Sequence, residues 1–372
     1  MSSSSVLPQD AGFMEQALAE ARKGRFWATP NPHVGCVIVS DNKILGKGFT
    51  QPVGGAHAEI MALGACASPR GATAYVTLEP CAHQGRTGPC VEALISAGIG
   101  RVVGALEDPN PSVSGKGYDR LRAAGIAVTQ GVCAEAARAE LAGFLLRMER
   151  GWGRVRLKLA CSLDGRTAMA SGESQWITGA MARQDVQRQR AASSVIITGI
   201  GTVLADDCSL TVRSDELGLR GEELTRALHR PPTRVVLDSN ARTPRDARVL
   251  SSNAPTLVVT ASGKQGPSGA LHKTAPVTVA GLDLRDVLES LGSQGANEIL
   301  IESGPSLAAA FLKAELVDEL LIYQAPVLLG SSARPLADLA FSELKDGIQL
   351  AYQEVSPLGS DLRIIAAVLK GN

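Results

Sequence analysis

The sequence lacks an excess of either charge, because its 372 residues include 37 Lys and Arg residues and 37 Asp and Glu residues. This balance disfavours a nucleic-acid partner that is held by overall charge. The sequence also lacks an apolar stretch long enough to cross a bilayer. Its first residues, MSSSSVLPQD, lack the basic and apolar regions of a signal peptide. We therefore expect a cytoplasmic protein that binds neither nucleic acid nor a membrane.

A disulfide framework is not indicated either. The seven cysteines are an odd number, and several, such as Cys36, Cys133 and Cys161, lie in apolar runs. This usage favours a reducing compartment. Hydrophobic residues make up 45% of the chain and charged residues 20%, which is typical of folded globular domains. A length of 372 residues predicts two of them.

Strands and helices alternate along the chain, and the pattern restarts near residues 150–154, RGWGR. We therefore expect domains over 1–150 and 151–372. The alternation predicts an α/β layer sandwich with a mostly parallel sheet, in which functional residues lie where strands lead into helices. In the second half we expect polar loops over 213–232 and 261–275, and strands at 155–165, 193–199, 233–238, 256–260, 276–280, 297–303, 318–326 and 361–369.

One stretch carries the ligands of a catalytic zinc site. It contains HAE at 57–59 and TLEPCAHQGRTGPC at 77–90. His57, Cys81 and Cys90 supply three ligands, which leaves the fourth position open for water, and Glu59 is available to transfer protons. Predicted helix starts at these positions favour thiolate over thiol. A closed site with His83 as fourth ligand, or reduced cysteines without metal, is the alternative.

The gap between the two cysteines distinguishes possible substrates. Zinc deaminases of nucleic acids have two residues between these cysteines, whereas this chain has eight, AHQGRTGP. A nucleic-acid deaminase would also need a basic face and has no use for a second α/β domain. A metal-stabilised scaffold that binds a nucleotide without catalysis would not need Glu59. The gap therefore favours a small-molecule deaminase.

Several motifs closely resemble the bifunctional deaminase–reductase family of riboflavin biosynthesis. They are NPHVGCVIV, HAE, TLEPCAHQGRTGPC, AGIGRVVGALEDPNPSVSGKG and LKLACSLDGRTAMASGESQWIT. The resemblance implies a cytidine-deaminase-like three-layer domain followed by a dihydrofolate-reductase-like α/β domain. It implies that a zinc domain removes the 2-amino group of 2,5-diamino-6-ribosylamino-4(3H)-pyrimidinone 5′-phosphate. A second domain then uses NADPH to reduce the ribosyl group to ribityl.

The resemblance also assigns residues to the deaminase site. It implies one zinc ion on His57, Cys81 and Cys90, with Glu59 as the proton shuttle. Positions that line the substrate pocket in the family correspond to Asn31, Arg86, Asp108 and Asn110. Amide and carboxylate groups can recognise a pyrimidine edge, and Arg86 suits a phosphate. Turn formation beside proline is the alternative role for Asn31 and Asn110.

The second half is less informative without the resemblance. There is no GxGxxG motif, so a Rossmann site is not indicated. The helix start at Pro305 could receive a phosphate or serve packing alone, and Trp176 is more typical of a core or loop aromatic. The resemblance implies cofactor contacts from Ala160, Trp176, Thr202, Asp206, Ser239, Gly304, Pro305, Ser306, Leu307, Ala308, Ala309 and Ala310. It implies substrate contacts from Ser174, Arg190, Leu210, Arg213 and Glu302.

Other reductase assignments stay open at this point. Lys158 and Asp164 lie close in sequence to the expected site, and Arg242 could meet the 2′-phosphate of NADPH. No proton donor is indicated by the sequence. The resemblance favours a homo-oligomer. The chain departs from the family pattern at four places, which are Thr50, Gly88, Ala142 and Cys208.

Overall fold

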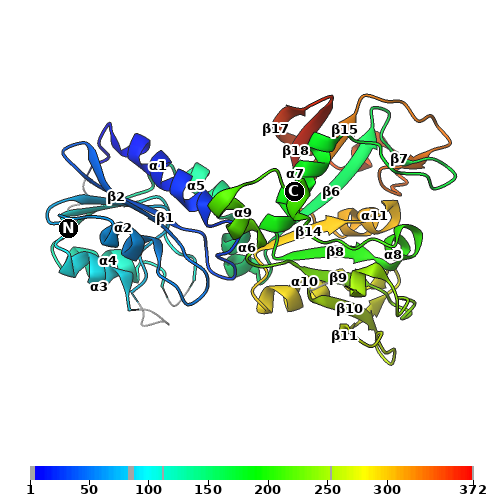
Figure 1. Cartoon of the computed structure of the whole chain (residues 1–372), viewed down its shortest axis with the longest axis horizontal. Coiled ribbons are helices and arrows are strands. Elements are labelled where there is room, and N and C mark those ends of the chain that lie inside the picture. Colours follow the sequence, from blue (N-terminus) through cyan, green and yellow to red (C-terminus); the bar gives the residue numbers. More distant parts are fainter. Residues whose placement is uncertain (1–4, 83–87, 111–112, 252–253, 371–372) are drawn as a thin grey trace. The chain divides into compact units, whose positions relative to one another are not determined.

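The computed structural model describes residues 5–82, 88–110, 113–251 and 254–370 (Figure 1). The chain forms two compact units, Met1–Gly151 and Trp152–Asn372, and each is described by itself. Among the described residues, no helix combines the length and apolarity that a membrane crossing requires. All seven cysteines are free thiols.

A mixed sheet, five-stranded in the described part of the chain, forms the centre of the first unit, with the order β2-β1-β3-β4-β5. β1 is antiparallel to both β2 and β3, whereas β3, β4 and β5 are parallel. The expectation of a mostly parallel sheet is therefore wrong for this unit. Asp41 and Asn42 adopt φ values of 49° and 57°, which form a tight hairpin turn and make β1 and β2 antiparallel. The strands are β1 (Gly35–Ser40), β2 (Lys43–Phe49), β3 (Thr73–Val76), β4 (Arg101–Gly104) and β5 (Ala127–Gln130).

Helices cover both faces of this sheet, and glycines permit their close approach. A Cβ atom on Gly35 of β1 would lie 1.9 Å from the carbonyl oxygen of Ala17 in α1. A Cβ atom on Gly48 of β2 would lie 2.3 Å from the carbonyl oxygen of Ala58 in α2. Gly48 is paired with Cys36, so these two residues point to the same face of the sheet. Gly35, the neighbour of Cys36 along β1, points to the opposite face, and α1 and α2 therefore lie on opposite faces. The helices are α1 (Asp10–Lys23), α2 (Ala58–Gly64), α3 (Cys90–Ser96), α4 (Lys116–Ala123), α5 (Ala134–Glu140) and α6 (Ala142–Arg150).

The second unit is built on a larger sheet, nine-stranded within the described residues, with the order β11-β10-β9-β8-β14-β6-β15-β18-β17. All neighbours from β11 to β15 are parallel, and the last two pairs are antiparallel, so the expectation of a mostly parallel sheet is confirmed here. The strands are β6 (Arg154–Ser162), β8 (Val195–Gly199), β9 (Thr233–Leu237), β10 (Thr256–Ala261), β11 (Leu271–Ala275), β14 (Glu298–Glu302), β15 (Glu319–Ala325), β17 (Leu350–Leu358) and β18 (Asp361–Val368).

Two hydrophobic layers sandwich this sheet. α10 and α11 pack on one face through residues such as Leu288 and Phe311, whereas α7 packs on the other through Val186. Two short ribbons, β12 (Val277–Thr278) with β13 (Gly281–Leu282) and β7 (Arg166–Ala168) with β16 (Arg334–Pro335), lie outside the sheet. The helices are α7 (Ala180–Ala192), α8 (Ile200–Asp206), α9 (Gly221–Leu228), α10 (Leu284–Ser293), α11 (Pro305–Lys313) and the 3₁₀ turns η1 (Ser214–Glu216), η2 (Arg248–Leu250) and η3 (Leu344–Asp346).

Two expectations for the second half are wrong, and one strand was not expected. The expected loop over 261–275 contains β11, and the expected loop over 213–232 contains α9. The strand β17 has no counterpart among the expected strands. Both β11 and β17 are sheet edges with mostly exposed side chains, so they lack the apolar run that marks a buried strand.

Candidate functional site

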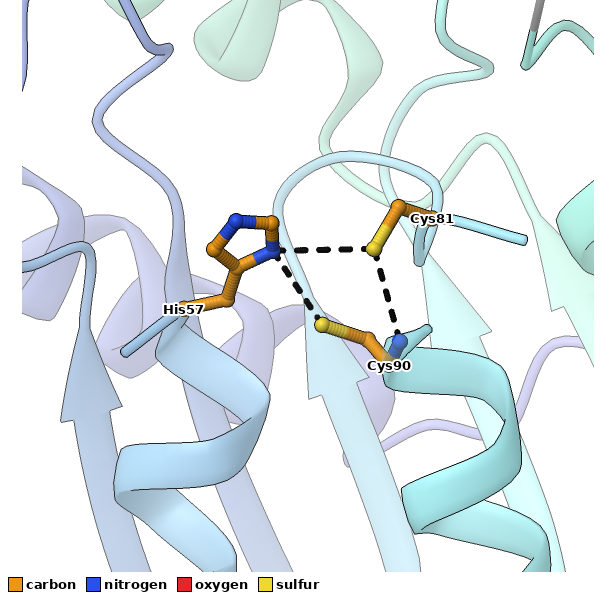
Figure 2. Close-up of side chains that lie close together, drawn as sticks. All are labelled: His57, Cys81 and Cys90. Atoms are coloured by element: carbon orange, nitrogen blue, oxygen red, sulfur yellow. Dashed lines mark hydrogen bonds between the residues drawn. The ribbon is translucent and has the colours of Figure 1, made fainter. Parts of the chain in front are cut away.

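Three short segments bring the proposed metal ligands of the first unit together (Figure 2). His57 is the residue that immediately precedes α2, Cys81 follows β3, and Cys90 is the first residue of α3. His57 and Cys90 therefore lie at helix starts, whereas Cys81 lies in the loop that follows β3. His83, the alternative fourth ligand, lies outside the described residues.

The spacing of these three side chains fits one zinc ion. His57 Nδ1 lies 3.6 Å from Cys81 Sγ and 3.2 Å from Cys90 Sγ, and the ligand atoms all lie within 4.8 Å of one another. A tetrahedral ion with Zn–S bonds of about 2.3 Å and a Zn–N bond of about 2.0 Å separates nitrogen from sulfur by about 3.5 Å. One imidazole and two thiolates are also the donor types that zinc prefers.

The two thiols differ in their readiness to ionise. A hydrogen bond from the Cys90 thiol, together with contacts from His57 and the Cys90 backbone N–H, lowers the pKa of Cys81 to about 4. The shared hydrogen bond and burial raise the pKa of Cys90. The hydrogen bond to Cys81 raises the pKa of His57. The pair therefore already carries one negative charge at neutral pH, which favours a cation.

The carboxyl group of Glu59 lies in the first turn of α2 and is 4% exposed. Burial, reinforced by the Cys81 thiolate, raises the pKa of Glu59 to about 7. A carboxyl group with such a pKa exchanges a proton readily near neutral pH. Because it lies beside the three candidate ligands, Glu59 is the candidate proton carrier of this site.

The expected substrate residues of this unit that the structure describes lie in two loops. Asn31 lies in the turn before β1, where its N–H donates to the carbonyl of Ala28 at 2.9 Å. Asp108 is buried in the loop after β4, and its carboxylate accepts the N–H of Asn110 at 2.9 Å. Arg86 lies outside the described residues.

The departures from the family pattern in this unit have local structural roles or none that is evident. Thr50 is buried, and its hydroxyl accepts the N–H of Val34 at 2.9 Å, so it secures the end of the hairpin. Gly88 is exposed just before α3, and Ala142 begins α6.

A cavity of about 1290 Å³ occupies the second unit at the carboxyl ends of β6, β8, β9 and β14. This is the end of a parallel sheet at which ligands usually bind, and the volume exceeds that of a typical single-ligand pocket. Most of the expected reductase residues line it: Ala160, Ser174, Trp176, Arg190, Thr202, Asp206, Ser239, Leu210, Arg213, Glu302, Gly304, Pro305, Ser306, Leu307 and Ala310.

Three candidates have other surroundings. Ala308 and Ala309 lie on the buried side of α11, and Ala308 belongs to the hydrophobic core. The carboxylate of Asp164 accepts the hydroxyl of Ser162 at 2.5 Å and the N–H groups of Leu329 and Gly330. Asp164 therefore joins two loops.

A charged cluster lies in this cavity. The carboxylate of Glu302 accepts two hydrogen bonds from Arg190, at 2.6 and 2.9 Å, and lies 3.6 Å from Lys158 Nζ. Burial alone would raise the pKa of Glu302, but the charges of Arg190 and Lys158 outweigh it and lower this pKa to about 2. Arg190 also donates to the carbonyl of Thr211. Glu302 is therefore ionised and fixed in orientation.

Sequence reasoning missed other residues that line the cavity. Arg183 and Gln187 lie on the same stripe of α7 as the predicted Arg190, a spacing that could have revealed them. Gln187 is buried and accepts the backbone N–H of Arg213 at 3.0 Å. Arg334 lies in a segment with no periodicity, so the sequence offered no signal for it. Cys208, a departure from the family pattern, also lines the cavity, and burial raises its pKa to about 11.

Two family models match the chain, one in each unit. Residues 7–106 match the family model of the cytidine and deoxycytidylate deaminase zinc-binding region, and residues 154–364 match that of the RibD C-terminal domain. The fold and the two sites thus define an enzyme in which a zinc-binding deaminase domain precedes a reductase domain that uses a nicotinamide cofactor.

Relatives match over nearly the full length. The chain is 47% identical to the riboflavin biosynthesis protein RibD of Escherichia coli K12, over 95% of this chain and 98% of that protein. The structure of RibD from Acinetobacter baumannii is 43% identical, with a TM-score of 0.88 over 97% of this chain and 99% of that one. A diaminohydroxyphosphoribosylaminopyrimidine deaminase/5-amino-6-(5-phosphoribosylamino)uracil reductase from Thermotoga maritima is 30% identical, with a TM-score of 0.85 over 97% and 99%.

The chain belongs to the RibD family of bifunctional deaminase/reductases of riboflavin biosynthesis. The predictions of family, fold class and paired enzymatic activities are thereby confirmed.

Proposed function

We propose that this chain first converts 2,5-diamino-6-ribosylamino-4(3H)-pyrimidinone 5′-phosphate to 5-amino-6-(5-phosphoribosylamino)uracil. It then reduces this product to 5-amino-6-(5-phosphoribitylamino)uracil. The name of the Thermotoga maritima relative supports both substrates. The observation that carries the proposal is the buried Glu59 carboxyl group beside the ligand cluster of His57, Cys81 and Cys90.

In the first step a carbon–oxygen bond forms at the ring carbon and the carbon–nitrogen bond to the amino group breaks. One zinc ion on His57, Cys81 and Cys90 would lower the pKa of water and so supply the nucleophile. Glu59 accepts one proton of that water and delivers it to the ring nitrogen, and then moves the second proton, from the new hydroxyl group, to the departing amine. Ammonia leaves, and no oxidant is needed.

Recognition of the pyrimidine falls to the loops before β1 and after β4. Asn31, Asp108 and Asn110 present amide and carboxylate groups that match a ring edge rich in donors and acceptors. Arg86 binds the 5′-phosphate, for which a guanidinium group offers paired donors.

For the second step, the cavity of the second unit holds the cofactor and the sugar phosphate. NADPH would supply a hydride to the sugar carbon. Arg242 lines the cavity, and we propose that it favours NADPH over NADH by binding the 2′-phosphate. The proposed cofactor contacts are Ala160, Trp176, Thr202, Asp206, Ser239 and the run from Gly304 to Ala310, of which Ala308 and Ala309 contribute only through packing.

The charged cluster orients the sugar. Because its donors are engaged by Glu302 and Thr211, Arg190 fixes Glu302 so that this carboxylate can accept hydrogen bonds from sugar hydroxyls. Arg213 is more exposed and binds the phosphate, with Ser174 and Leu210 beside it. Lys158 lines the cavity as a cation beside Glu302, and we propose that it donates the proton that accompanies hydride transfer.

We also propose a cytoplasmic homo-oligomer. The free state of all seven cysteines supports a reducing compartment. The exposed side chains of the edge strand β17 support association between copies.

Glu59→Gln tests the first step, because it keeps the shape of the side chain and removes its acidity. We expect ammonia release to be abolished, while zinc content stays the same and NADPH oxidation on previously deaminated substrate is unchanged. Ammonia release at a near wild-type rate would contradict the assignment of Glu59.

A further inference from the structure

Glu79 is a buried carboxylate in the turn that carries the zinc ligand Cys81. One of its oxygens accepts the N–H groups of Asp108 at 3.2 Å and Gly115 at 3.0 Å. The other accepts the N–H groups of Gly117 at 2.7 Å and Tyr118 at 3.4 Å. Four backbone N–H groups, which lie 29 to 39 residues after Glu79 in the sequence, therefore donate to this one side chain.

Two of these hydrogen bonds, from Gly117 and Tyr118, cap the N-terminus of α4, although Glu79 belongs to a distant segment of the chain. The first N–H groups of a helix have no partner within the helix, and a negative charge there is favoured by the helix dipole. The residue that precedes α4, Gly115, has no side chain that could cap it. Glu79 fills that role. The fit is close, because a Cβ atom on Gly117 would lie 2.1 Å from the carbonyl oxygen of Pro80.

The same carboxylate fixes the loop between β4 and α4. It holds the N–H of Asp108, whose own carboxylate accepts the N–H of Asn110. On the other side of the turn, Cys81 is joined to α3, since its sulfur accepts the N–H of Cys90 at 3.4 Å. A continuous set of hydrogen bonds therefore runs from the ligand turn to Asn110.

We propose that Glu79 is a positioning residue for deamination. It sets the distance between the Cys81 turn and the loop that carries Asp108 and Asn110, and so places the substrate ring against the zinc site. This inference rests on the proposed function, which assigns Asp108 and Asn110 to the substrate.

Glu79→Gln is the first test, in the full-length chain loaded with zinc. The amide keeps the shape of the side chain but presents a donor where two backbone N–H groups need an acceptor. Hydrogen bonds to a charged group are stronger than those to a neutral amide. We therefore expect the KM for the diaminopyrimidinone phosphate, measured by ammonia release, to rise about tenfold to a hundredfold. We expect kcat per bound zinc to change by less than about threefold, since Glu79 does not touch the reacting atoms.

Glu79→Asp keeps the charge and both oxygens but is one methylene shorter, so its KM should lie between those of the wild type and Glu79→Gln. It also serves if Glu79→Gln fails to retain zinc. Glu92→Gln is the matched control, because Glu92 also bonds to α4, through Arg120, but on the exposed surface. Its KM should equal that of the wild type.

The outcomes separate the two proposals. If the wild-type chain releases no ammonia from the diaminopyrimidinone phosphate, the proposed function fails. If the wild type is active and a zinc-loaded Glu79 variant keeps its KM, the positioning role is overturned. A loss of zinc in proportion to activity in both variants, with KM unchanged, would likewise overturn it and assign Glu79 to stability alone.

Discussion

Glu302→Gln removes the charge of a buried carboxylate and leaves its two cationic neighbours in place. Glu302 is 7% exposed, and its partners Arg190 and Lys158 are also largely removed from water. The variant keeps the volume of the side chain, so packing in the second unit is preserved. The experiment therefore isolates the electrostatic contribution of one group.

Two estimates of its magnitude agree. Leaving a buried charge without its partner costs about 3–5 kcal/mol. Independently, lowering the pKa of Glu302 from an ordinary 4.5 to about 2 corresponds to about 3 kcal/mol. In a domain of this size each kcal/mol changes the melting temperature by about 2–4 °C. We expect the second unit of Glu302→Gln to melt roughly 6–12 °C below the wild type.

The difference should depend on pH with a defined sign. The pKa of Glu302 is lower in the folded state than in the unfolded state, so the ion pair stabilises the fold fully above the unfolded value of 4.5. That contribution is lost as pH falls through about 2. The melting temperatures of the wild type and Glu302→Gln should therefore differ by a constant amount above about pH 5 and become equal in strong acid.

Calorimetry of the full-length chain measures both units at once, and the transition of the first unit serves as an internal reference. Glu343→Gln is the control, because Glu343 pairs with Lys345 on the surface, where side chains are 60% and 76% exposed. Such a pair contributes about 0–1 kcal/mol. If Glu302→Gln melted as little below the wild type as this control does, the reasoning would be refuted.

Two further predictions concern the proposed sites. Lys158→Met should lower NADPH oxidation by about 10²- to 10⁴-fold without affecting ammonia release, and a drop of only a few-fold would mean that the proton comes from elsewhere. Gly48→Ala should destabilise the first unit by about 1–3 kcal/mol and impair ammonia release, because its methyl group would press on α2, which carries Glu59. Gly12→Ala, whose methyl group meets nothing within 4 Å, should melt no lower than the wild type, and equal melting of both variants would contradict the packing argument.

The features that could be predicted from the sequence are those with a local chemical signature. His57, Cys81 and Cys90 combine ligand chemistry with nearby element boundaries, and the structure brings them together. Buried strands such as β8 and β14 were predicted because a short run of β-branched residues marks them. The edge strand β17 was missed since its exposed, mixed side chains carry no such pattern.

Other features depend on contacts between distant segments or on rotation along a helix. The four donors that meet Glu79 belong to backbone groups, which have no sequence signature, so only the folded loop reveals them. The run from Gly304 to Ala310 shows the second limit. Successive residues of an α-helix point about 100° apart, so seven consecutive residues cannot all face one cavity. Ala308 and Ala309 therefore turn into the core, while Leu307 and Ala310 line the cavity.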